Sequence, residues 1–497
     1  MTPPGGAPTG TPASGAARAF GWPAVATVAL LLGALGAMNP AVALLVAGAA
    51  ALIAAAFVRP ELATLAGVFA IYTNAVVVAV RFHGMPYALG AVVPALLAVP
   101  VAAFVVIQRR RLVVPPETPY VLVFFFAQAM GALSARDPTV SGKALLESLL
   151  EGLLLYFLVV NAARGPRTLY RIAWVLVAAG FLMGAVPLYQ QVTGAFDSDF
   201  GGFGQRAEVP FRAQHSSAGA ADVMQFRLAG PIGEINRYAQ VMLMVVPVGL
   251  FLVWSERRGV ARILALVATG TILAGFALAF SRGAAIAALL LFCIMLALRI
   301  VSVRQALAVC LAASLLLVAV PQYMTRITSL PVVSELVLGQ EAEIDGAVKG
   351  RLTEMLAAAL VFSDHPVFGV GPGMFEHYCQ EYGNRLEIRR LEGARQAHCL
   401  YLDLAAEHGV VGLFAFLGMV TVTMRRLLRA RRRCMARRPE LAHLATAYLL
   451  MIIAYLTTGI FLHLSYFRYF WLMMALGAAV AAAAEHAARR DRRPRGR

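Results

Sequence analysis

The sequence predicts an all-α, polytopic integral membrane protein. Its 497 residues are 60% hydrophobic and only 14% charged, too few charges to cover the surface of a soluble chain of this length. Apolar runs of about 16–23 residues, long enough to cross roughly 30 Å of hydrocarbon as a helix, recur along most of the chain. Basic residues collect in alternate connections between these runs. These three observations exclude a soluble multidomain protein.

About 12–14 transmembrane helices are expected from the apolar runs. The candidate spans are residues 22–37, 41–57, 63–80, 86–107, 117–133, 144–162, 171–192, 237–254, 263–281, 283–298, 305–320, 400–423, 444–464 and 467–484. Residues 1–21 are rich in Pro, Gly, Ala and Thr, which predicts a disordered tail. A signal peptide is the alternative for residues 1–37, but its start carries only Arg18 and another apolar run follows at once.

The distribution of charge predicts the orientation in the membrane. The formal net charge is +17, from 43 Lys+Arg and 26 Asp+Glu. If the N-terminus is cytoplasmic, the predicted inner segments contain 27 cations and six acids, and the rest of the chain contains 16 cations and 20 acids. This is the asymmetry expected of cytoplasmic connections. The basic blocks at 425–438 and 489–497 therefore indicate topology determinants and contacts with anionic lipids, not a nucleic-acid partner.

Two long segments fall on the outer side, residues 193–236 and 321–399. Because the other connections are mostly short, chemistry outside the membrane would be built from these two segments. The sequence contains no visible internal repeat and no matching pair of broken helices, features that are typical of transporters.

Two outer arginines lie where a charge is costly. Arg282 is in the tight turn 280–284 between two apolar runs, which places its guanidinium at the outer hydrocarbon boundary. It is either a snorkelling interfacial residue or a forked cation that binds phosphate. Arg227 precedes a Gly/Pro turn that leads into the next span, and it is either an ordinary loop residue or a second such cation. Asn236 is a plausible N-cap for that span.

The second outer segment contains three further features. Residues 351–363 have the pattern of an amphipathic interfacial helix that opens with Arg351, and the glycines of 369–373 predict a turn that folds closely against the membrane domain. The segment ends at His398, which is either a structural hydrogen-bond donor or a general base. Tyr401 shares the helical face of His398, whereas Glu407 points roughly opposite, so a dyad between His398 and Glu407 is not expected.

These features, in this order, resemble the O-antigen ligase and polymerase superfamily of bacterial membrane glycosyltransferases. The resemblance rests on an outer Arg before a Gly/Pro turn and Asn, a tight Ser-Arg-Gly-Ala turn, an Arg-led loop helix with a Pro-x-x-Gly-x-Gly-Pro-Gly turn, and a His before a Leu-Tyr-Leu helix. It covers residues 226–412, approximately. The chain departs from the pattern at Ile235, where many members have Pro, and at Cys399, where many have Asn.

The resemblance implies transfer of a glycan from an undecaprenyl-diphosphate carrier to an acceptor hydroxyl, with inversion and without a metal or other cofactor. Arg227 and Arg282 would hold the diphosphate, and His398 would be the general base. Arg351, Asn236 and Tyr401 would bind substrate. The Asn replaced by Cys399 leaves the acceptor open: lipid A-core or a protein hydroxyl for a ligase, or another lipid-linked repeat unit for a polymerase.

The implied organisation has four parts. These are a cytoplasmic tail (1–21), N-terminal spans (22–192), a ligase-like catalytic membrane region (193–484) and a basic cytoplasmic tail (485–497). The implied location is the bacterial inner membrane, with both termini cytoplasmic. A transporter is the alternative of another class. Cys379 and Cys399 both face the outer side and could pair, which their spacing cannot establish.

Overall fold

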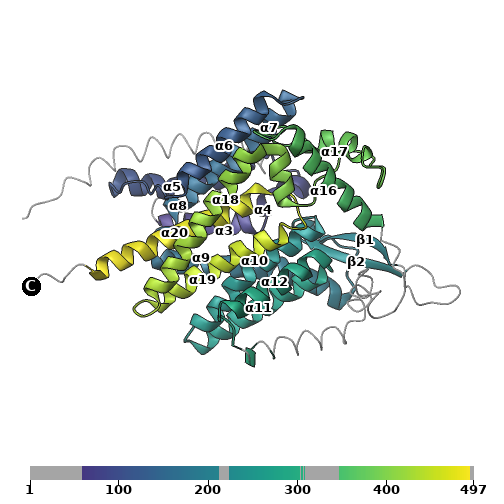
Figure 1. Ribbon diagram of the computed structural model, residues 1–497. Helices are drawn as coiled ribbons and strands as arrows, with labels where there is room; N and C mark the ends of the chain where they lie inside the picture. The colour runs from purple at the N-terminus through teal and green to yellow at the C-terminus, as the bar shows by residue number, and fades with distance from the viewer. Residues whose placement is uncertain (1–58, 212–222, 303, 306, 308–345, 493–497) are drawn as a thin grey trace, which may run out of the picture.

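Membrane-length apolar helices dominate the part of the chain that the computed structural model describes, residues 59–211, 223–302, 304, 305, 307 and 346–492. Eight described helical segments are long and apolar enough to cross a membrane, and a bent pair, α3 (Pro60–Tyr72) with α4 (Ala75–His83), is a ninth if counted as one span. Two shorter apolar helices are α6 (Thr118–Leu133) and α12 (Arg282–Ala297). The protein is therefore a multi-pass membrane protein (Figure 1).

The remaining helices follow in chain order. Up to the first outer segment they are η1 (Tyr87–Ala91), α5 (Val92–Ala102), η2 (Ala103–Ile107), α7 (Pro138–Ser148), η3 (Leu149–Leu154), α8 (Leu155–Ala162) and α9 (Pro166–Thr193). After it come α10 (Ile235–Ser255), α11 (Gly259–Leu278), α16 (Gly346–Asp364), α17 (Phe375–Asn384), α18 (Leu400–Cys434), α19 (Pro439–Thr458) and α20 (Phe467–Arg492). The apolar windows of α10, α19 and α20 are 83%, 78% and 78% buried, against 22% for α11. The first three helices therefore form the centre of the bundle, and α11 lies at its surface.

The predicted spans coincide with helices wherever the structure describes them, but several of their bounds differ and one of them is broken. The predicted tail 1–21, the spans 22–37 and 41–57, and almost all of the span 305–320 lie outside the described residues. The predicted span 400–423 is too short, because α18 continues to Cys434. Residues 424–434 are mostly Arg, Leu and Ala, which favour helix, and Arg426 is buried in the bundle.

A two-stranded antiparallel hairpin is the element that the all-α prediction missed. It consists of β1 (Gln205–Phe211) and β2 (Val223–Gly230), with Ala207 opposite Arg227. A short η4 turn (Phe200–Gly202) precedes it. The alternation of these strands is brief and lies between long apolar helices, so its signal in the sequence is weak. Arg227 therefore lies on a paired strand and not in a loop.

The expected span 63–80 is not one straight helix. It is broken between α3 and α4 by 58°, at Thr73 and at Asn74, whose φ is +59°. The Asn74 amide donates to the Pro231 carbonyl at 2.8 Å, so the turn after β2 fills the break. The sequence did not predict this break, because a contact distant in sequence stabilises a conformation that the local pattern does not reveal.

A second break, in α18 at Gly409, joins the outer segment to the membrane helix. Gly409 has φ +63° and ψ −168°, which leaves helix carbonyls and amides around it without their usual partners. Residues 366–371 supply these partners. The amides of Val370 and Gly371 donate to the Ala406 and Glu407 carbonyls at 3.0 Å each, and the amide of Val410 donates to the Pro366 carbonyl at 2.8 Å.

Glycine is required on both sides of this junction. Gly369 has φ +69°, and a Cβ there would overlap the backbone of Glu407; a Cβ at Gly409 would overlap the Val367 carbonyl. The predicted close approach of the glycine turn to the membrane domain is therefore confirmed. Since α16 leads directly into this turn, the junction fixes α16 relative to α18.

The α16 helix has one buried and one exposed side. Ala357, Ala358 and Val361 pack with Phe375 and Tyr378 of α17 in a small separate core. Leu352, Leu356 and Leu360 are exposed on the other side. The predicted helix at 351–363 is confirmed and begins five residues earlier, at Gly346. Its position at a membrane interface stays a prediction.

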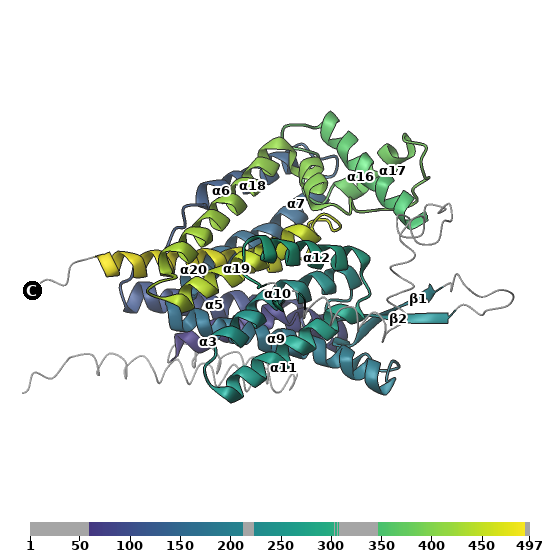
Figure 2. The ribbon, with the colours of Figure 1, turned by 60° about the horizontal axis from the view of Figure 1, so that its bottom comes forward.

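Both outer segments lie at one end of the bundle. In Figure 2 the hairpin, α16 and α17 are together at the right, and α20 leaves the bundle at the left, toward the C-terminus. The bend at Gly409 turns the first part of α18 toward α16. The elements that the sequence placed on the outer side therefore gather where a common site can form.

Candidate functional site

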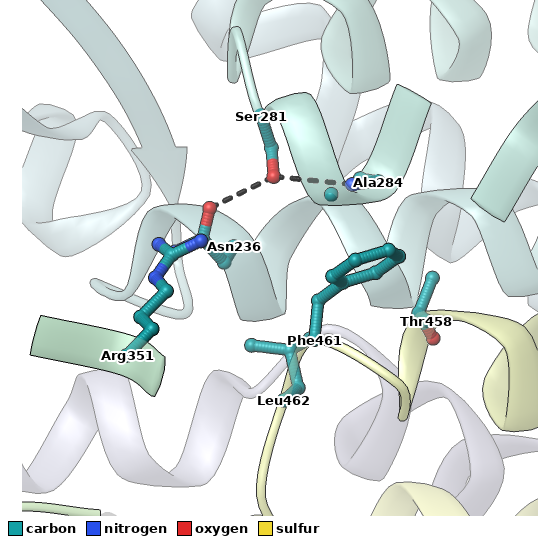
Figure 3. A pocket seen from close by; sticks show the side chains of 8 residues that line it. Asn236, Ser281, Ala284, Arg351, Thr458, Phe461 and Leu462 are labelled. Carbon is teal, nitrogen blue, oxygen red and sulfur yellow. Dashed lines mark hydrogen bonds between the residues drawn. The ribbon is translucent and has the colours of Figure 1, made fainter. Parts of the chain in front are cut away.

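A narrow pocket lies at this end of the bundle, where four elements converge. Asn236 comes from the first turn of α10, Arg351 from α16 and Thr458 from the end of α19. The N-terminus of α12 contributes Ser281, Gly283 and Ala284, and the connection between α19 and α20 contributes Phe461 and Leu462. Figure 3 shows the Arg351 side chain extending from α16 into this space. Two of the predicted substrate-binding residues, Asn236 and Arg351, thus line the same pocket.

The turn that carries Arg282 is only three residues long, as the sequence predicts. The α11 helix ends at Leu278 and α12 begins at Arg282, with Ser281 as its N-cap. The Ser281 hydroxyl accepts from the Ala284 amide at 3.4 Å and donates to the Asn236 Oδ1 at 2.8 Å (Figure 3). Arg282 is therefore the first residue of a helix whose N-terminus opens into the pocket.

Asn236 does not cap α10, contrary to the sequence prediction. The helix begins at Ile235, its N-cap position is Glu234, and Asn236 lies inside the first turn. Its side chain contacts Ser281 and so joins the first turns of α10 and α12. Glu234 has an extended backbone, and the helix begins directly after it. The side-chain amide of Asn236 is therefore not used as a cap and is available to the site.

Arg227 lies against the same turn. Its Nε donates to the Ala279 carbonyl at 3.1 Å and its Nη2 donates to the Phe280 carbonyl at 3.2 Å. These carbonyls are at the end of α11, where a cation is stabilised by the partial negative charge of the helix terminus. Arg227 thus holds the turn that carries Arg282, and direct contact with a diphosphate stays a prediction.

His398 is not among the residues that line the pocket, but it contacts α16, the helix that carries Arg351. Its Nε2 is 3.6 Å from the Oε2 of Glu354, whose other oxygen accepts from Arg395 at 3.2 Å. Glu354 is one helical turn from Arg351 and its side chain is only 2% exposed. Glu407 is elsewhere: its carboxylate accepts from the Phe375 amide at 3.1 Å, as expected from its opposite helical direction.

The electrostatics of this cluster keep His398 neutral. Burial lowers the pKa of His398 to about 4, with further lowering by the charges of Arg351, Arg395 and Arg237. An imidazole is uncharged at any pH well above its pKa. The His398 imidazole therefore has a lone pair on one ring nitrogen at neutral pH, and it is surrounded by cations that suit an anionic ligand.

The connection between α19 and α20 completes the site and was not predicted from the sequence. The Leu400 amide donates to the Gly459 carbonyl at 2.7 Å, and Asp403 accepts from the Leu464 amide at 3.0 Å. This connection places His463 next to His398, with ring centroids 5.9 Å apart. The sequence did not reveal this connection, because Phe461 and Leu462 continue the apolar run beyond the helix end at Thr458, and the predicted span 444–464 therefore included them.

Arg237 holds this connection from the other side. It is 1% exposed and donates to the His463 carbonyl at 2.8 Å, to the Ser465 hydroxyl at 2.6 Å and to the Gln240 side chain at 2.7 Å. Its charge also lowers the pKa of His463, to about 2, after the larger effect of burial. The sequence does indicate that Arg237 is unusual, since a charge inside an apolar run is costly. Nothing in the sequence, however, indicates that Arg237 contacts residues 463–465.

Tyr401 has a structural contact in addition to its predicted role. Its hydroxyl donates to the Leu456 carbonyl at 2.9 Å, which joins the first turn of α18 to α19. Cys379 and Cys399 are both buried and are free thiols. Within the described residues, no group of three or more His, Cys, Asp or Glu side chains could hold a metal ion.

Residues 268–417 match the family model described as O-antigen ligase. The match includes Arg282, Arg351, His398 and Tyr401, whereas Arg227 and Asn236 precede it. It overlaps most of the region 226–412 to which the sequence resemblance extends. No curated protein matches the chain. Residues 268–417 of this multi-pass membrane protein are therefore similar to the O-antigen ligase family.

Proposed function

We propose that the protein transfers a glycan from an undecaprenyl-diphosphate carrier to an acceptor hydroxyl at the outer face of the bacterial inner membrane. One observation carries this proposal: a neutral, half-buried histidine contacts α16, the helix that contributes Arg351 to a pocket also lined by the N-terminal turns of two helices. The O-antigen ligase family implies lipid-linked glycans as substrates.

The groups around the pocket have the chemistry that binds a diphosphate. Helix N-termini bind phosphate because their free amides and the partial positive charge of the helix point toward the anion. The first turns of α10 and α12 both face the pocket, and α12 begins with Arg282. A guanidinium matches phosphate oxygens with parallel hydrogen bonds and stays charged in a low dielectric. In this proposal Arg282 and Arg351 bind the diphosphate and stabilise the charge that develops on it as the glycosidic bond breaks.

His398 supplies the acceptor side of the reaction. As the general base it removes the proton of the acceptor hydroxyl while the oxygen attacks the anomeric carbon. Attack opposite the leaving diphosphate inverts the configuration at that carbon. Because cationic and hydrogen-bonding side chains stabilise the leaving group, this mechanism uses no metal ion.

Ligase and polymerase activities remain the two versions of this proposal. They share the transfer chemistry and differ only in the acceptor, which is lipid A-core or a protein hydroxyl in one and a second lipid-linked repeat unit in the other. A transporter is the alternative of another class, and the break between α3 and α4 is the feature that favours it. That break is occupied by the turn after β2, through the bond between Asn74 and Pro231.

Deleting the gene and resolving the cell-surface glycans on a gel tests the proposal. Loss of polymer from lipid A-core, with accumulation of lipid-linked polymer, supports a ligase, and surface glycans carrying single repeats support a polymerase. Complementation with the wild-type chain should restore the profile, and complementation with His398→Ala should not. An unchanged profile for every surface glycan and glycoprotein would contradict both versions.

A further inference from the structure

We propose that Glu354 is a positioning residue for His398: it orients the imidazole toward the acceptor hydroxyl and stabilises the imidazolium that forms during transfer. This inference rests on the proposed function and adds a residue to it. The observation behind it is the 3.6 Å separation between Glu354 Oε2 and His398 Nε2, deep in the contact between α16 and the start of α18.

The environment of Glu354 favours a functional role. Its side chain is 2% exposed, and a buried carboxylate is costly unless it is paired. Arg395 pairs with Oε1 only, at 3.2 Å, and among the described residues Oε2 makes no hydrogen bond. Burial raises the pKa of Glu354, while the charges of Arg395, Arg351 and Arg389 lower it. The oxygen that faces His398 is thus available to an imidazole N–H, and this bond can tighten when substrate binds.

The same geometry assigns the two ring nitrogens. If Nε2 carries the hydrogen and donates to Glu354, then Nδ1 carries the lone pair. Nδ1 is enclosed and has no hydrogen-bond partner within the described part of the chain. An acceptor hydroxyl that reached Nδ1 would give it a partner, so the carboxylate would select Nδ1 as the nitrogen that acts as the base.

In the transfer step, the acceptor oxygen forms a bond to the anomeric carbon. The bond from that carbon to the diphosphate oxygen breaks, and its electron pair stays on the diphosphate. The hydroxyl proton moves to Nδ1, while the Nε2 hydrogen remains bonded toward Glu354. The new positive charge on the imidazole therefore lies next to the carboxylate. This matters because Arg351, Arg395 and Arg237 all disfavour that charge.

The test compares Glu354→Gln with Glu354→Asp in purified full-length protein, using lipid-linked glycan donor and the acceptor found by gene deletion. We expect Glu354→Gln to lower kcat by about 10²- to 10⁴-fold with little change in the KM for donor. The acid limb of its pH profile should move to lower pH, since a lost negative charge makes protonation of His398 harder. Glu354→Asp keeps the charge and should recover part of the rate.

Glu381→Gln is the matched control. Glu381 also pairs with arginines in the outer segment, Arg136 and Arg385, but it is 40% exposed on α17 and belongs to a different cluster. This variant should retain wild-type kcat and pH profile. Thermal unfolding in detergent should be similar for all three variants, which separates positioning from folding.

Two results would contradict the inference about Glu354 and leave the proposed function intact. The first is wild-type turnover by Glu354→Gln in a protein that His398→Ala inactivates. The second is an equal loss in Glu354→Gln and Glu354→Asp with an unmoved pH profile, which indicates packing alone. If His398→Ala itself transfers glycan at the wild-type rate, the general-base part of the proposed function fails, and the inference fails with it.

Discussion

Buried arginines at the two ends of the bundle have opposite surroundings. Arg426, at the end near the C-terminus, is 3% exposed and donates to both oxygens of Glu117 and both oxygens of Glu485, at 2.9–3.3 Å. Arg237, at the site end, is 1% exposed and donates to a carbonyl, a hydroxyl and an amide, with the carboxylate of Glu234 at 3.6 Å. Arg426 is hydrogen-bonded to two carboxylates, whereas Arg237 is hydrogen-bonded to neutral groups and has the Glu234 carboxylate at a longer ion-pair distance.

From this difference we expect Arg426 to contribute to the stability of the fold and Arg237 to contribute to the function of the site. A buried cation with two carboxylates stabilises one arrangement of helices and has nothing left to offer a ligand. A cation whose hydrogen bonds go to neutral groups, with its one carboxylate farther away, keeps more of its field and is better suited to attract an anion from outside. The field of Arg237 reaches both His398 and His463, whose pKa values it lowers. If the two ends differ in this way, substitutions at one end should affect transfer and substitutions at the other should affect stability.

The largest effect is expected at the site end, from Arg282→Ala. Loss of the guanidinium at the start of α12 should reduce transfer by at least about 10²- to 10³-fold, as expected for loss of a preorganised charge at the leaving group. Arg282→Lys should recover only part of this, because a lysine cannot make the forked contact. Glycan transfer in the deletion strain is the measurement, and membrane abundance by immunoblot should be unchanged.

Arg390→Ala is the control for this prediction. Arg390 is exposed in the second outer segment, residues 321–399, and does not line the pocket. Its removal should leave transfer within about twofold of wild type, since a single exposed charge contributes little. An equal loss in both variants would mean that general outer charge matters, and would remove the specific role of Arg282.

At the other end of the bundle, Arg426→Leu should affect stability instead. It leaves Glu117, which is fully buried, without its partner, and breaking a buried ion pair in this way costs about 3–5 kcal/mol. We expect lower abundance and a lower unfolding temperature in detergent, with normal turnover per folded molecule. The double variant Arg426→Leu/Glu117→Leu should recover stability. A specific loss of turnover in Arg426→Leu would contradict the division between the two ends.

Much of the fold could be predicted from the sequence, because length and hydrophobicity alone determine which segments cross a membrane. The tight turn at Arg282 was predicted for the same reason, since both flanking runs are too apolar to leave the bilayer. The breaks at Asn74 and Gly409 were not predicted, because each depends on a partner far away in the chain, at Pro231 and at residues 366–371.

Part of the site was predicted, because polar groups next to apolar runs are costly and therefore conspicuous in the sequence. Arg282, Arg351 and His398 stand out as polar groups next to apolar runs, and Asn236 was selected although its capping role was wrong. Glu354 lies in an amphipathic helix where an acid is ordinary, and His463 follows an apolar run that hides the end of α19. Only the folded chain brings these two side chains to His398, Glu354 from α16 and His463 from the connection between α19 and α20, so no local pattern could identify them.

The junction between the outer segment and α18 should have an intermediate effect, tested by Gly369→Ala. The substitution places a Cβ at φ +69° and against the backbone of Glu407. We expect a cost of about 1 kcal/mol from the backbone conformation and a further cost from the overlap. Transfer should fall along with stability, because α16 carries both Arg351 and Glu354. Thermal unfolding and transfer measured on the same membranes check this.

Gly393→Ala separates the two contributions. Gly393 has φ +74° in the same outer segment, but among the described residues nothing lies within 4 Å of the position that a Cβ would take, so only the conformational cost applies. It should be destabilised less than Gly369→Ala and should keep its transfer activity. Equal effects in the two variants would show that the close approach to α18 contributes nothing.

The smallest effect is expected from Tyr401→Phe. Its hydroxyl donates to the Leu456 carbonyl, and loss of one such bond costs about 0.5–1.5 kcal/mol. If that bond is the main role of Tyr401, transfer should stay within a few-fold of wild type while the unfolding temperature falls slightly. If instead the hydroxyl also binds substrate, the KM for donor or acceptor should rise at unchanged stability. Steady-state kinetics beside thermal unfolding therefore decide between a structural contact and the predicted substrate contact.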